Sequence, residues 1–394
     1  MRILFLSSRI PHPPDRGDRV RAFHLLETFA SEHEVDLLTF TEREMDRPDG
    51  KALGALCGRV EEVVLPRSRS VARAFRGLLS RDPLQVHYYK DKAFGERVRA
   101  LVREDPYDLV FSHLFRVFPY ARSVEGAFRL LDLTDVISRE VVASAAYRRF
   151  PMNRVYRLEG ARIRRFEIGA CRDAHEIWVI SEAEREILAR EGVGEKVRVV
   201  PNGVEPALLA TPLPAGGGKR IGFLGHLEVF HNVDSLSFFC ERVLPRIRER
   251  VPEARLLIAG RGASPVVNDL ARRDGVRFEG FVDDLAAFFA RIDLFIAPLR
   301  FAAGTQNKVI QAMAAGVPVL VSPEVARGID GSAEEAFLTA SSEEDWVEKA
   351  VELLRDGGRA RFLGEAGRRF VESRFTWNVA RERLRTIERE RGGS

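Results

Sequence analysis

The stretch from residue 293 to residue 323 holds the residue types and spacing that most clearly suggest chemistry. It predicts a buried strand, a turn of small residues, and a helix from near Thr305 to Gly316. The first amides of a helix have no intrahelical partner, and the helix dipole gives that end a partial positive charge. The segment therefore predicts an anion site. Its amides belong to Thr305, Gln306 and Asn307.

Two neighbours of these amides are also suited to an anion. Gly304 in the turn lets a ligand approach the backbone closely. Lys308 places a cation within the first helical turn, where it is unfavourable for the helix itself but suits a bound diphosphate. The same residues also fit a capped helix in which Lys308 is incidental, so wider context has to decide.

Polar residues stand at the ends of two predicted strands in the first half of the chain. His113 follows the strand Asp108–Ser112, and Asp132 and Asp135 flank the end of the strand Phe128–Leu133. Ligands of doubly wound sheets sit beyond the carboxyl ends of the strands, so each residue is a candidate catalytic base or hydroxyl anchor. A structural hydrogen bond explains each of them equally well.

The loop after the first predicted strand carries Gly17 and Asp18. Asp18 is a candidate catalytic residue, and it is also suited to cap the helix Asp18–Ser31 that follows. Helical spacing places five apolar residues on one face of that helix: Val20, Phe23, Leu26, Phe29 and Ala30.

Strands and helices alternate through both halves of the chain, which predicts parallel sheets with right-handed crossovers. In the first half we expect strands at Arg2–Ser7, Glu34–Phe40, Val60–Leu65, Asp108–Ser112, Phe128–Leu133, Glu176–Ser181 and Val197–Val200. In the second half we expect them at Arg220–Leu224, Ala254–Ala259, Val276–Phe278, Asp293–Ala297 and Val317–Val321. A helix is expected over Val233–Val251, interrupted near Pro245.

Turn-forming residues are dense between Pro201 and Gly218, which predicts a linker. A chain of 394 residues is long enough for two domains. The expected architecture is therefore α/β, with two doubly wound Rossmann-like domains and the ligand site in the cleft between them.

Charge and cysteine content limit the possible partners and compartments. The net charge is only +4, but residues 67–103 hold ten Arg and Lys against three Asp and Glu, and residues 148–172 hold eight against two. Such blocks suit an anionic partner such as a membrane, and they are equally explained as a solvated surface. Three widely spaced cysteines favour a reducing cytoplasm over a disulfide framework. The sequence has no stretch of about 18 apolar residues, so we expect no membrane-spanning helix.

Several common sites are excluded by their missing motifs. Gly260-Arg261-Gly262 follows a strand, but Pro265 stands where a dinucleotide fingerprint needs its third glycine. The chain has no P-loop, no GxSxG elbow and no His/Cys cluster with metal spacing. Tyr88 and Tyr89 beside Lys90 are too isolated to predict nucleic-acid binding. We expect no cofactor and no metal.

An ordered series of short motifs resembles glycosyltransferase family 4, whose members have the GT-B fold. The motifs are VPNGV at 200–204, GFLG at 222–225, LIAG at 257–260, VRFEGF at 276–281 and QAMAAGVPV at 311–319. The opening SSRIPHPPDRGDRVRAFHLL and the segment PLRFAAGTQNK are similar to a bacterial branch associated with exopolysaccharide production. The resemblance covers most of the chain.

The resemblance implies a metal-independent transfer of a sugar, with retention, from a nucleotide-diphosphate sugar to an acceptor. The donor would bind to the C-terminal domain, residues 203–376. The acceptor would bind mainly to the N-terminal domain, residues 1–202, onto which the last helix, within 377–394, crosses back. Chemistry of this kind needs stabilisation of the leaving charge and orientation of the acceptor. The acceptor is expected to be a glycan or lipid-linked, and the enzyme cytoplasmic, with peripheral contact to an anionic membrane.

The sequence departs from the family pattern at several donor positions. Ala303 and Gln311 stand where the family has a pair of glutamates, and Gln311 can still bind hydroxyl groups. His226 and His231, after Gly225, replace an expected Arg and Lys. We therefore expect the missing positive charge to come from Lys308 and two arginines. These are Arg261 and Arg300.

The family resemblance also bears on the first half of the chain. Gly17 stands where relatives have paired glycines near the donor diphosphate, and Asp135 stands where they often carry His. Two alternatives to a transferase remain. The loss of both motif glutamates fits a degenerate binding or scaffold protein, and a nucleotide-sugar 2-epimerase shares the fold.

Overall fold

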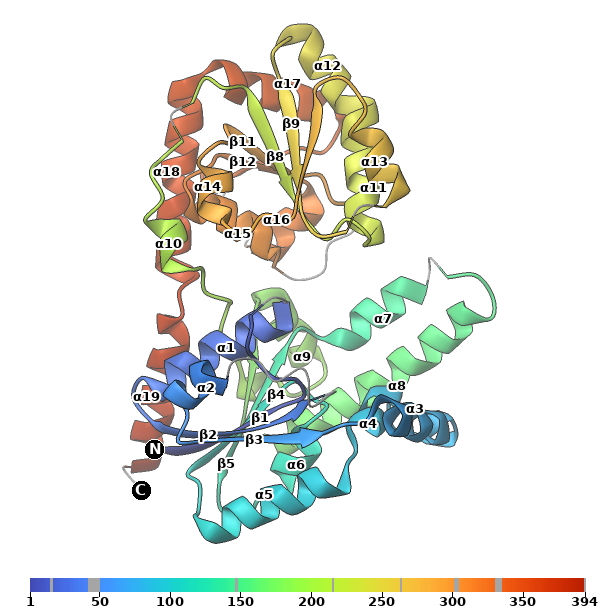
Figure 1. Cartoon of the computed structure of the whole chain (residues 1–394), viewed down its shortest axis with the longest axis vertical. Helices are drawn as coiled ribbons and strands as arrows, with labels where there is room; N and C mark the ends of the chain where they lie inside the picture. Colours follow the sequence, from blue (N-terminus) through green and yellow to red (C-terminus); the bar gives the residue numbers. More distant parts are fainter. Residues whose placement is uncertain are drawn as a thin grey trace. The chain divides into compact units, whose positions relative to one another are not determined.

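The structure, a computed structural model, describes residues 1–14, 17–41, 50–145, 148–214, 216–262, 264–300, 305–329 and 335–392. It divides into two compact units, called here the first and second domains (Figure 1). The first domain takes in Met1–Val200 and the segment that begins at Trp377, and the second is Pro201–Thr376.

The first domain is built on a parallel sheet of seven strands in the order β3-β2-β1-β4-β5-β6-β7. The central strands β1 and β4 are almost wholly buried, because helices cover both faces of the sheet. The strands are β1 Arg2–Ser7, β2 Glu34–Thr41, β3 Arg59–Val64, β4 Leu109–His113, β5 Phe128–Thr134, β6 Glu176–Val179 and β7 Val197–Val199.

The helices of the first domain follow the strands in alternation. They are α1 Gly17–Ala30, α2 Gly50–Leu56, α3 Arg67–Arg76, the 3-10 turn η2 Gly77–Leu79, α4 Leu84–Tyr89, α5 Lys92–Glu104, α6 Phe118–Arg122, α7 Ile137–Ala145, α8 Met152–Asp173, α9 Glu182–Arg190, the 3-10 turn η3 Gly194–Lys196 and α19 Asn378–Gly392. The helices α7 and α8 pack against each other and project from the sheet as an arm (Figure 1).

The second domain repeats the plan with a parallel sheet in the order β10-β9-β8-β11-β12-β13. Its strands are β8 Arg220–Leu224, β9 Arg255–Ala259, β10 Val276–Gly280, β11 Leu294–Ala297, β12 Val319–Val321 and β13 Leu338–Thr339. Its helices are α10 Pro206–Leu209, α11 Phe230–Phe238, the π-helical turn η4 Phe239–Val243, α12 Leu244–Arg250, α13 Pro265–Leu270, α14 Leu285–Phe289, α15 Asn307–Ala314, α16 Pro323–Ile329, α17 Glu343–Arg355 and α18 Gly357–Arg374.

Both strand orders are those of a doubly wound Rossmann-like sheet, so the predicted fold class is confirmed. Local predictions needed correction. The short helix α10 lies inside the predicted linker, and β13 was not predicted because it is only two residues long. The helix expected over Val233–Val251 begins at Phe230 and passes through a π-helical turn. The next helical segment places Pro245 in its first turn, where no backbone donor is needed.

The predicted buried face of α1 was also partly wrong. Leu26 and Phe29 are buried as expected, but Val20, Phe23 and Ala30 are only partly buried. Buried in their place are Arg21, Ala22, Leu25 and Thr28. The helix is rotated so that Arg21 reaches a buried carboxylate, an interaction that apolar spacing does not reveal.

The C-terminal helix α19 packs on the first domain, beside α1 (Figure 1). Leu384 and Ile387 join the core cluster around β1 and α1. Arg383 pairs with the buried Glu176 at the start of β6 through a 2.8 Å bond from Nε, and Arg385 pairs with Glu32. Within the described residues, no helix is both long and apolar enough to cross a membrane.

Candidate functional site

The turn after β8 brings two backbone segments of the second domain, at Gly225 and at Gly260, unusually close together. The amide of Gly225 donates to the carbonyl of Ala259 at 3.1 Å. A Cβ on Gly260, whose φ is +147°, would lie 1.7 Å from the carbonyl oxygen of Gly225. A Cβ on Gly225 would touch the amide group of Asn232 at 3.0 Å. Only glycines fit this turn, and their small size lets Asn232 of α11 pack against it.

Lys308, in the first turn of α15, reaches this same turn. Its Nζ donates to Asn232 Oδ1 at 2.7 Å and lies 4.9 Å from the centre of the Phe223 ring. Asn232 Nδ2 donates in turn to the carbonyl of His226 at 3.0 Å. The chain of contacts joins the start of α15 to the ends of β8 and α11.

The charge of Lys308 has no acidic partner among the described residues. Among the described residues no carboxylate lies within 4 Å of its Nζ, and burial lowers its pKa to about 7. An enclosed ammonium costs free energy unless an anion accompanies it, and the positive end of the helix dipole adds to that cost. The arrangement is suited to an anion at the start of α15, which would offset both penalties.

Two histidines flank this turn. His226 is exposed, and its carbonyl rather than its ring is held by Asn232. Burial lowers the pKa of His231, and the charge of Lys308 lowers it further. A neutral His231 can donate one hydrogen bond to a ligand but adds no charge.

The two arginines predicted to supply charge each have a neighbour. Arg261 stacks on the exposed Phe281 ring at 4.4 Å, and Arg300 pairs with Asp234 through a 2.8 Å bond from Nε. Arg300 is thus paired with a carboxylate, whereas no carboxylate of the described residues lies within 4 Å of Lys308 Nζ.

The remaining predicted donor residues lie around the start of α15. The helix begins at Asn307, two residues later than predicted, because Thr305 instead donates its hydroxyl to the carbonyl of Gly328 at 2.8 Å. Gln306 is the N-cap residue without a side-chain capping bond, and Asn307 Oδ1 accepts from Asn202 Nδ2 at 3.2 Å. Gln311 is partly exposed one turn further on. Ala303 and Gly304 lie outside the described residues.

In the first domain, a buried ion pair holds the ends of β4 and β5 against α1. Arg21 and Asp132 are both fully buried, and two parallel bonds of 2.9 and 2.7 Å join them. Arg21 also donates to the carbonyl of Val200 at 3.0 Å. Burial alone would raise the pKa of Asp132, but Arg21 and His113 outweigh it and hold that pKa at about 2.

Asp132 also orients His113. The distance from His113 Nδ1 to Asp132 Oδ2 is 2.9 Å, so the ionised carboxylate holds the proton on Nδ1. The opposite nitrogen, Nε2, is buried and has no hydrogen-bond partner in the described structure. It is thus an acceptor that can take a proton from a hydroxyl group, as a general base does.

Asp18 is close to this histidine but does not cap α1. It lies inside the first turn, one residue after the start at Gly17, and its carboxylate pairs with Arg9 Nη1 at 2.9 Å. Burial raises the pKa of Asp18, but Arg9, His113 and Arg116 outweigh burial and leave it below its usual value. The predicted capping role was wrong, because Arg9 draws the side chain away from the helix amides.

Asp135 lies in a different environment. Burial, and after it the nearby charge of Glu184, raise its pKa to about 7. Glu184 accepts from the amide of Val136 at 2.8 Å, and Glu167 of α8 accepts from the amide of Ser138 at 3.4 Å. Two buried glutamates thus bind amides at the start of α7. The structure gives Glu167 the role that the sequence did not reveal.

Two family models match the chain. "Glycosyl transferase 4-like domain" matches residues 16–203, and "Glycosyl transferases group 1" matches residues 218–356, so together they span more than half of it. The chain belongs to the glycosyltransferases.

Curated relatives of this glycosyltransferase match over part of their length. A GDP-mannose-dependent monoacylated alpha-(1-6)-phosphatidylinositol monomannoside mannosyltransferase of Corynebacterium glutamicum is 30% identical over 164 residues, which are 37% of this chain and 42% of that protein. A GDP-mannose-dependent alpha-(1-6)-phosphatidylinositol monomannoside mannosyltransferase of Mycobacterium tuberculosis is 33% identical over 162 residues, 36% of this chain and 40% of that protein. The match therefore spans about two-fifths of these relatives.

A solved structure matches this glycosyltransferase over almost its whole length. Anabaena Alr3699/HepE in complex with UDP superposes with a TM-score of 0.70 and 14% identity, covering 99% of this chain and all of the other. At this identity the likeness shows the fold, which is the GT-B arrangement of two Rossmann-like domains.

Sequence reasoning missed several residues of this glycosyltransferase's sites. Asn232, which holds both Lys308 and the turn after β8, lies in a helix without a recognised motif. One signal could have revealed Arg21. It lies next to Ala22 and four residues before Leu25, and so among the buried residues of α1. Arg116 follows β4 closely but belongs to no motif.

Proposed function

We propose that this glycosyltransferase transfers a sugar, with retention, from a nucleotide-diphosphate sugar to a glycan or lipid-linked acceptor. The single observation that carries the proposal is Lys308. Its ammonium is enclosed at the positive end of α15, with an amide and an aromatic ring as neighbours. A bound diphosphate supplies the anion that this geometry needs, and it is the leaving group of such a transfer.

The acceptor and pathway follow from the relatives and from the sequence motifs. The curated relatives are named for phosphatidylinositol mannosides, which supports a lipid-linked acceptor. The motifs of the opening loop support a role in exopolysaccharide or related glycoconjugate assembly. We propose that the reaction needs no metal, because Lys308 and the amides of α15 offset the charge of the leaving diphosphate.

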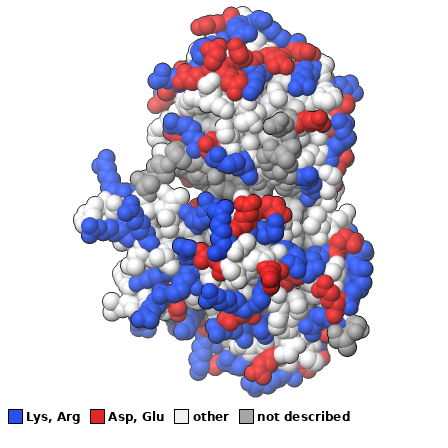
Figure 2. Space-filling model, turned by 180° about the vertical axis from the view of Figure 1, so that it is seen from behind, with Lys and Arg blue, Asp and Glu red and all other residues white. Residues whose placement is uncertain are grey.

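Peripheral membrane contact is part of this proposal, through a surface of the first domain that combines exposed apolar and basic side chains. Its apolar members lie on α3, η2 and the arm α7–α8, next to exposed arginines (Figure 2). They are Val71, Phe75, Leu78, Leu79, Val142, Phe150, Met152, Val155 and Leu158. We call this set the apolar–basic surface. Such a composition is suited to the interface of an anionic bilayer.

Vesicle binding tests the membrane contact. Replacing Phe75 and Leu79, which are 68% and 99% exposed, by Ser should reduce co-sedimentation with vesicles containing phosphatidylglycerol at least several-fold. Phe362→Ser, at a residue that is 51% exposed in the second domain, is the matched control and should bind as the parent does. Equal binding by all three proteins would contradict the contact.

Donor turnover tests the reaction itself. The protein is incubated with UDP- and GDP-sugars, with and without a lipid extract as a source of acceptor, and the free nucleoside diphosphate is measured. Release that depends on the extract supports transfer, and the anomeric configuration of the product reports on retention. Isomerisation of the sugar without acceptor would indicate an epimerase, and binding without turnover a scaffold protein. Either outcome would contradict the proposal.

A further inference from the structure

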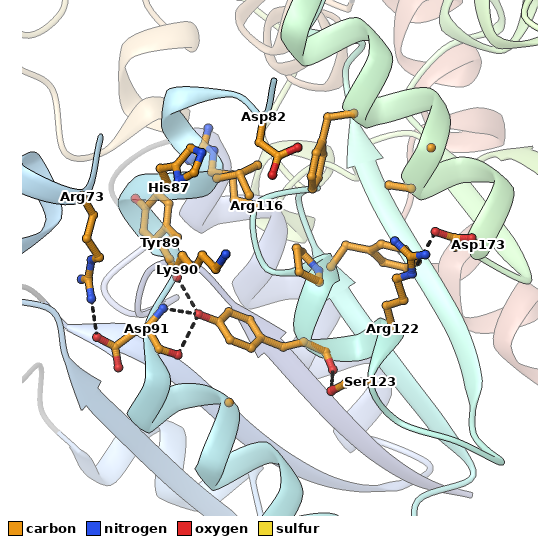
Figure 3. Close-up of a pocket in the computed structure, with 18 of the residues that line it drawn as sticks. Arg73, Asp82, His87, Tyr89, Lys90, Asp91, Arg116, Arg122, Ser123 and Asp173 are labelled. Atoms are coloured by element: carbon orange, nitrogen blue, oxygen red, sulfur yellow. Dashed lines mark hydrogen bonds and ion pairs between the residues drawn. The ribbon is translucent and has the colours of Figure 1, made fainter. Parts of the chain in front are cut away.

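A large cavity opens in the first domain between α4, α5, α6 and α8 (Figure 3). Its volume is about 1010 Å³, enough for a phosphorylated sugar or lipid head group. Eight Arg and Lys side chains line it, against three Asp. Every residue that lines it belongs to the first domain, whereas Lys308 belongs to the second.

Among the described residues, most of the positive charge around this cavity has no acidic partner. Ion pairs of 2.8 and 3.2 Å join Arg73 to Asp91 and Arg122 to Asp173, and Lys92 lies 3.4 Å from Glu96. The other five cations have no carboxylate within 4 Å in the described part of the chain. They are Arg81, Lys90, Arg99, Arg116 and Arg165. An excess of unpaired cations in one concave site favours an anionic ligand.

Arg116 is the least solvated of these cations. It is partly buried beside Tyr89, with its guanidinium carbon 5.8 Å from the ring centre (Figure 3). Burial lowers its pKa, and its Nε is buried without a hydrogen-bond partner in the described structure. A guanidinium with an unused donor is suited to phosphate oxygens, which its planar fork binds in pairs.

Aromatic and apolar side chains form another part of the lining. Phe118, Pro119, Tyr120 and Phe166 supply it. The Tyr120 hydroxyl donates to the carbonyl of Tyr89 at 2.7 Å and accepts from the amide of Asp91 at 2.6 Å, so its ring is held in a fixed position. Cations beside fixed rings suit a ligand that joins an anionic group to an apolar or ring-shaped part.

The cavity is linked directly to the apolar–basic surface. Arg165 of the cavity wall donates to the carbonyl of Arg81 at 2.9 Å, and Arg162, one turn earlier in α8, donates to the carbonyl of Leu78 at 2.7 Å. Leu79, the next residue, is 99% exposed. A ligand whose anionic group lies in the cavity can therefore extend an apolar chain along this surface.

We propose that this cavity binds a phosphate or diphosphate group carried on an apolar chain, as in a lipid-linked acceptor. Its identification as an acceptor rests on the proposed function, whereas the binding itself does not. The unpaired cations hold the phosphate, the aromatic wall contacts the first part of the chain, and the apolar–basic surface holds the remainder.

Calorimetry with soluble probes tests this site. Farnesyl phosphate is the lipid phosphate, farnesol its uncharged counterpart, and inorganic pyrophosphate the free anion. In the full chain, the double variant Arg81→Gln, Arg99→Gln should bind farnesyl phosphate at least 10-fold more weakly. The matched control is Arg103→Gln, because Arg103 is exposed on the same helix as Arg99 but does not line the cavity. Its affinity should not change.

Each outcome decides the proposal. Tight binding of farnesyl phosphate and weak binding of farnesol and pyrophosphate supports a lipid phosphate. Equal binding of pyrophosphate assigns the cavity to a free phosphate compound and overturns the lipid source. Absence of farnesyl phosphate binding, or equal affinity in the double variant, overturns the site. UDP and GDP binding in the same proteins separates this failure from failure of the proposed function, because the variants leave the second domain unchanged.

Discussion

Both domains hold charge beside their central strands, but among the described residues only that of the first domain is paired with an opposite charge. Arg21 and Asp132 form a doubly bonded pair in which each charge offsets the other. Lys308 in the second domain donates to an amide oxygen and lies over an aromatic ring, and no carboxylate of the described residues lies within 4 Å of its Nζ. A compensated buried pair can be purely architectural, whereas a desolvated charge without a counterion is suited to binding an anionic ligand.

The same contrast appears in the groups that surround each charge. In the first domain, Asp132 also accepts a hydrogen bond from His113 Nδ1, so the ion pair fixes the orientation of a candidate base. In the second, Asn232 holds Lys308 against a glycine turn that leaves the backbone open to a ligand. The first arrangement positions a side chain, and the second prepares a binding site.

The largest effect should come from breaking the compensated pair. Arg21→Met leaves Asp132 buried without its partner and should destabilise the first domain by about 3–5 kcal/mol. Urea unfolding in a Trp346→Phe background measures this, because the other two tryptophans, Trp178 and Trp377, lie in the first domain. Arg185→Gln, which breaks an exposed pair with Glu182, is the control and should cost no more than about 1 kcal/mol. Similar losses in both variants would contradict the contrast.

A smaller effect, dependent on pH, should follow from removing the uncompensated charge. The pKa of Lys308 is about 7 in the folded protein, below its ordinary value, so between pH 7 and about 10 the unfolded state binds more protons. The stability of the ligand-free second domain should therefore rise with pH in this range. Lys308→Met should remove that slope and stabilise the domain by about 1–3 kcal/mol at pH 7. Urea unfolding followed through the fluorescence of Trp346 measures the pH slope and the stability. If the stabilities of parent and variant change with pH in parallel, the assignment of the lowered pKa to Lys308 is contradicted.

The opposite pH dependence is expected from a buried carboxyl group in the first domain. Burial raises the pKa of Glu167 to about 7, so the folded state binds more protons than the unfolded state between about pH 4.5 and 7. Its contribution to stability should be lost as pH rises through this range. Glu167→Gln keeps an acceptor for the Ser138 amide and should gain about 1 kcal/mol at pH 8. Glu182→Gln, at an exposed position on α9, should leave the pH profile unchanged.

The sequence predicted what depends on local pattern. Alternating apolar segments predicted both parallel sheets. The role of Lys308 as a donor-site cation was predicted from its place at the start of a helix, and it stays a prediction. The Arg21–Asp132 pair was missed because its partners lie 111 residues apart, and apolar spacing assigns an arginine to the surface. The role of Asn232 depends on the close approach of Gly225 and Gly260, which only the folded chain shows.

The central claim is that Lys308 binds the diphosphate of the donor. Calorimetric titration with UDP and GDP tests this claim most directly. Titrations at pH 8, in buffers of different ionisation enthalpy, measure the protons taken up on binding. A diphosphate beside Lys308 should raise its pKa, so we expect binding of one of these nucleotides with uptake of up to about one proton. Lys308→Met should abolish the uptake and weaken binding about 10–100-fold. Failure of both nucleotides to bind, or the same affinity and proton count in the variant, would contradict the account.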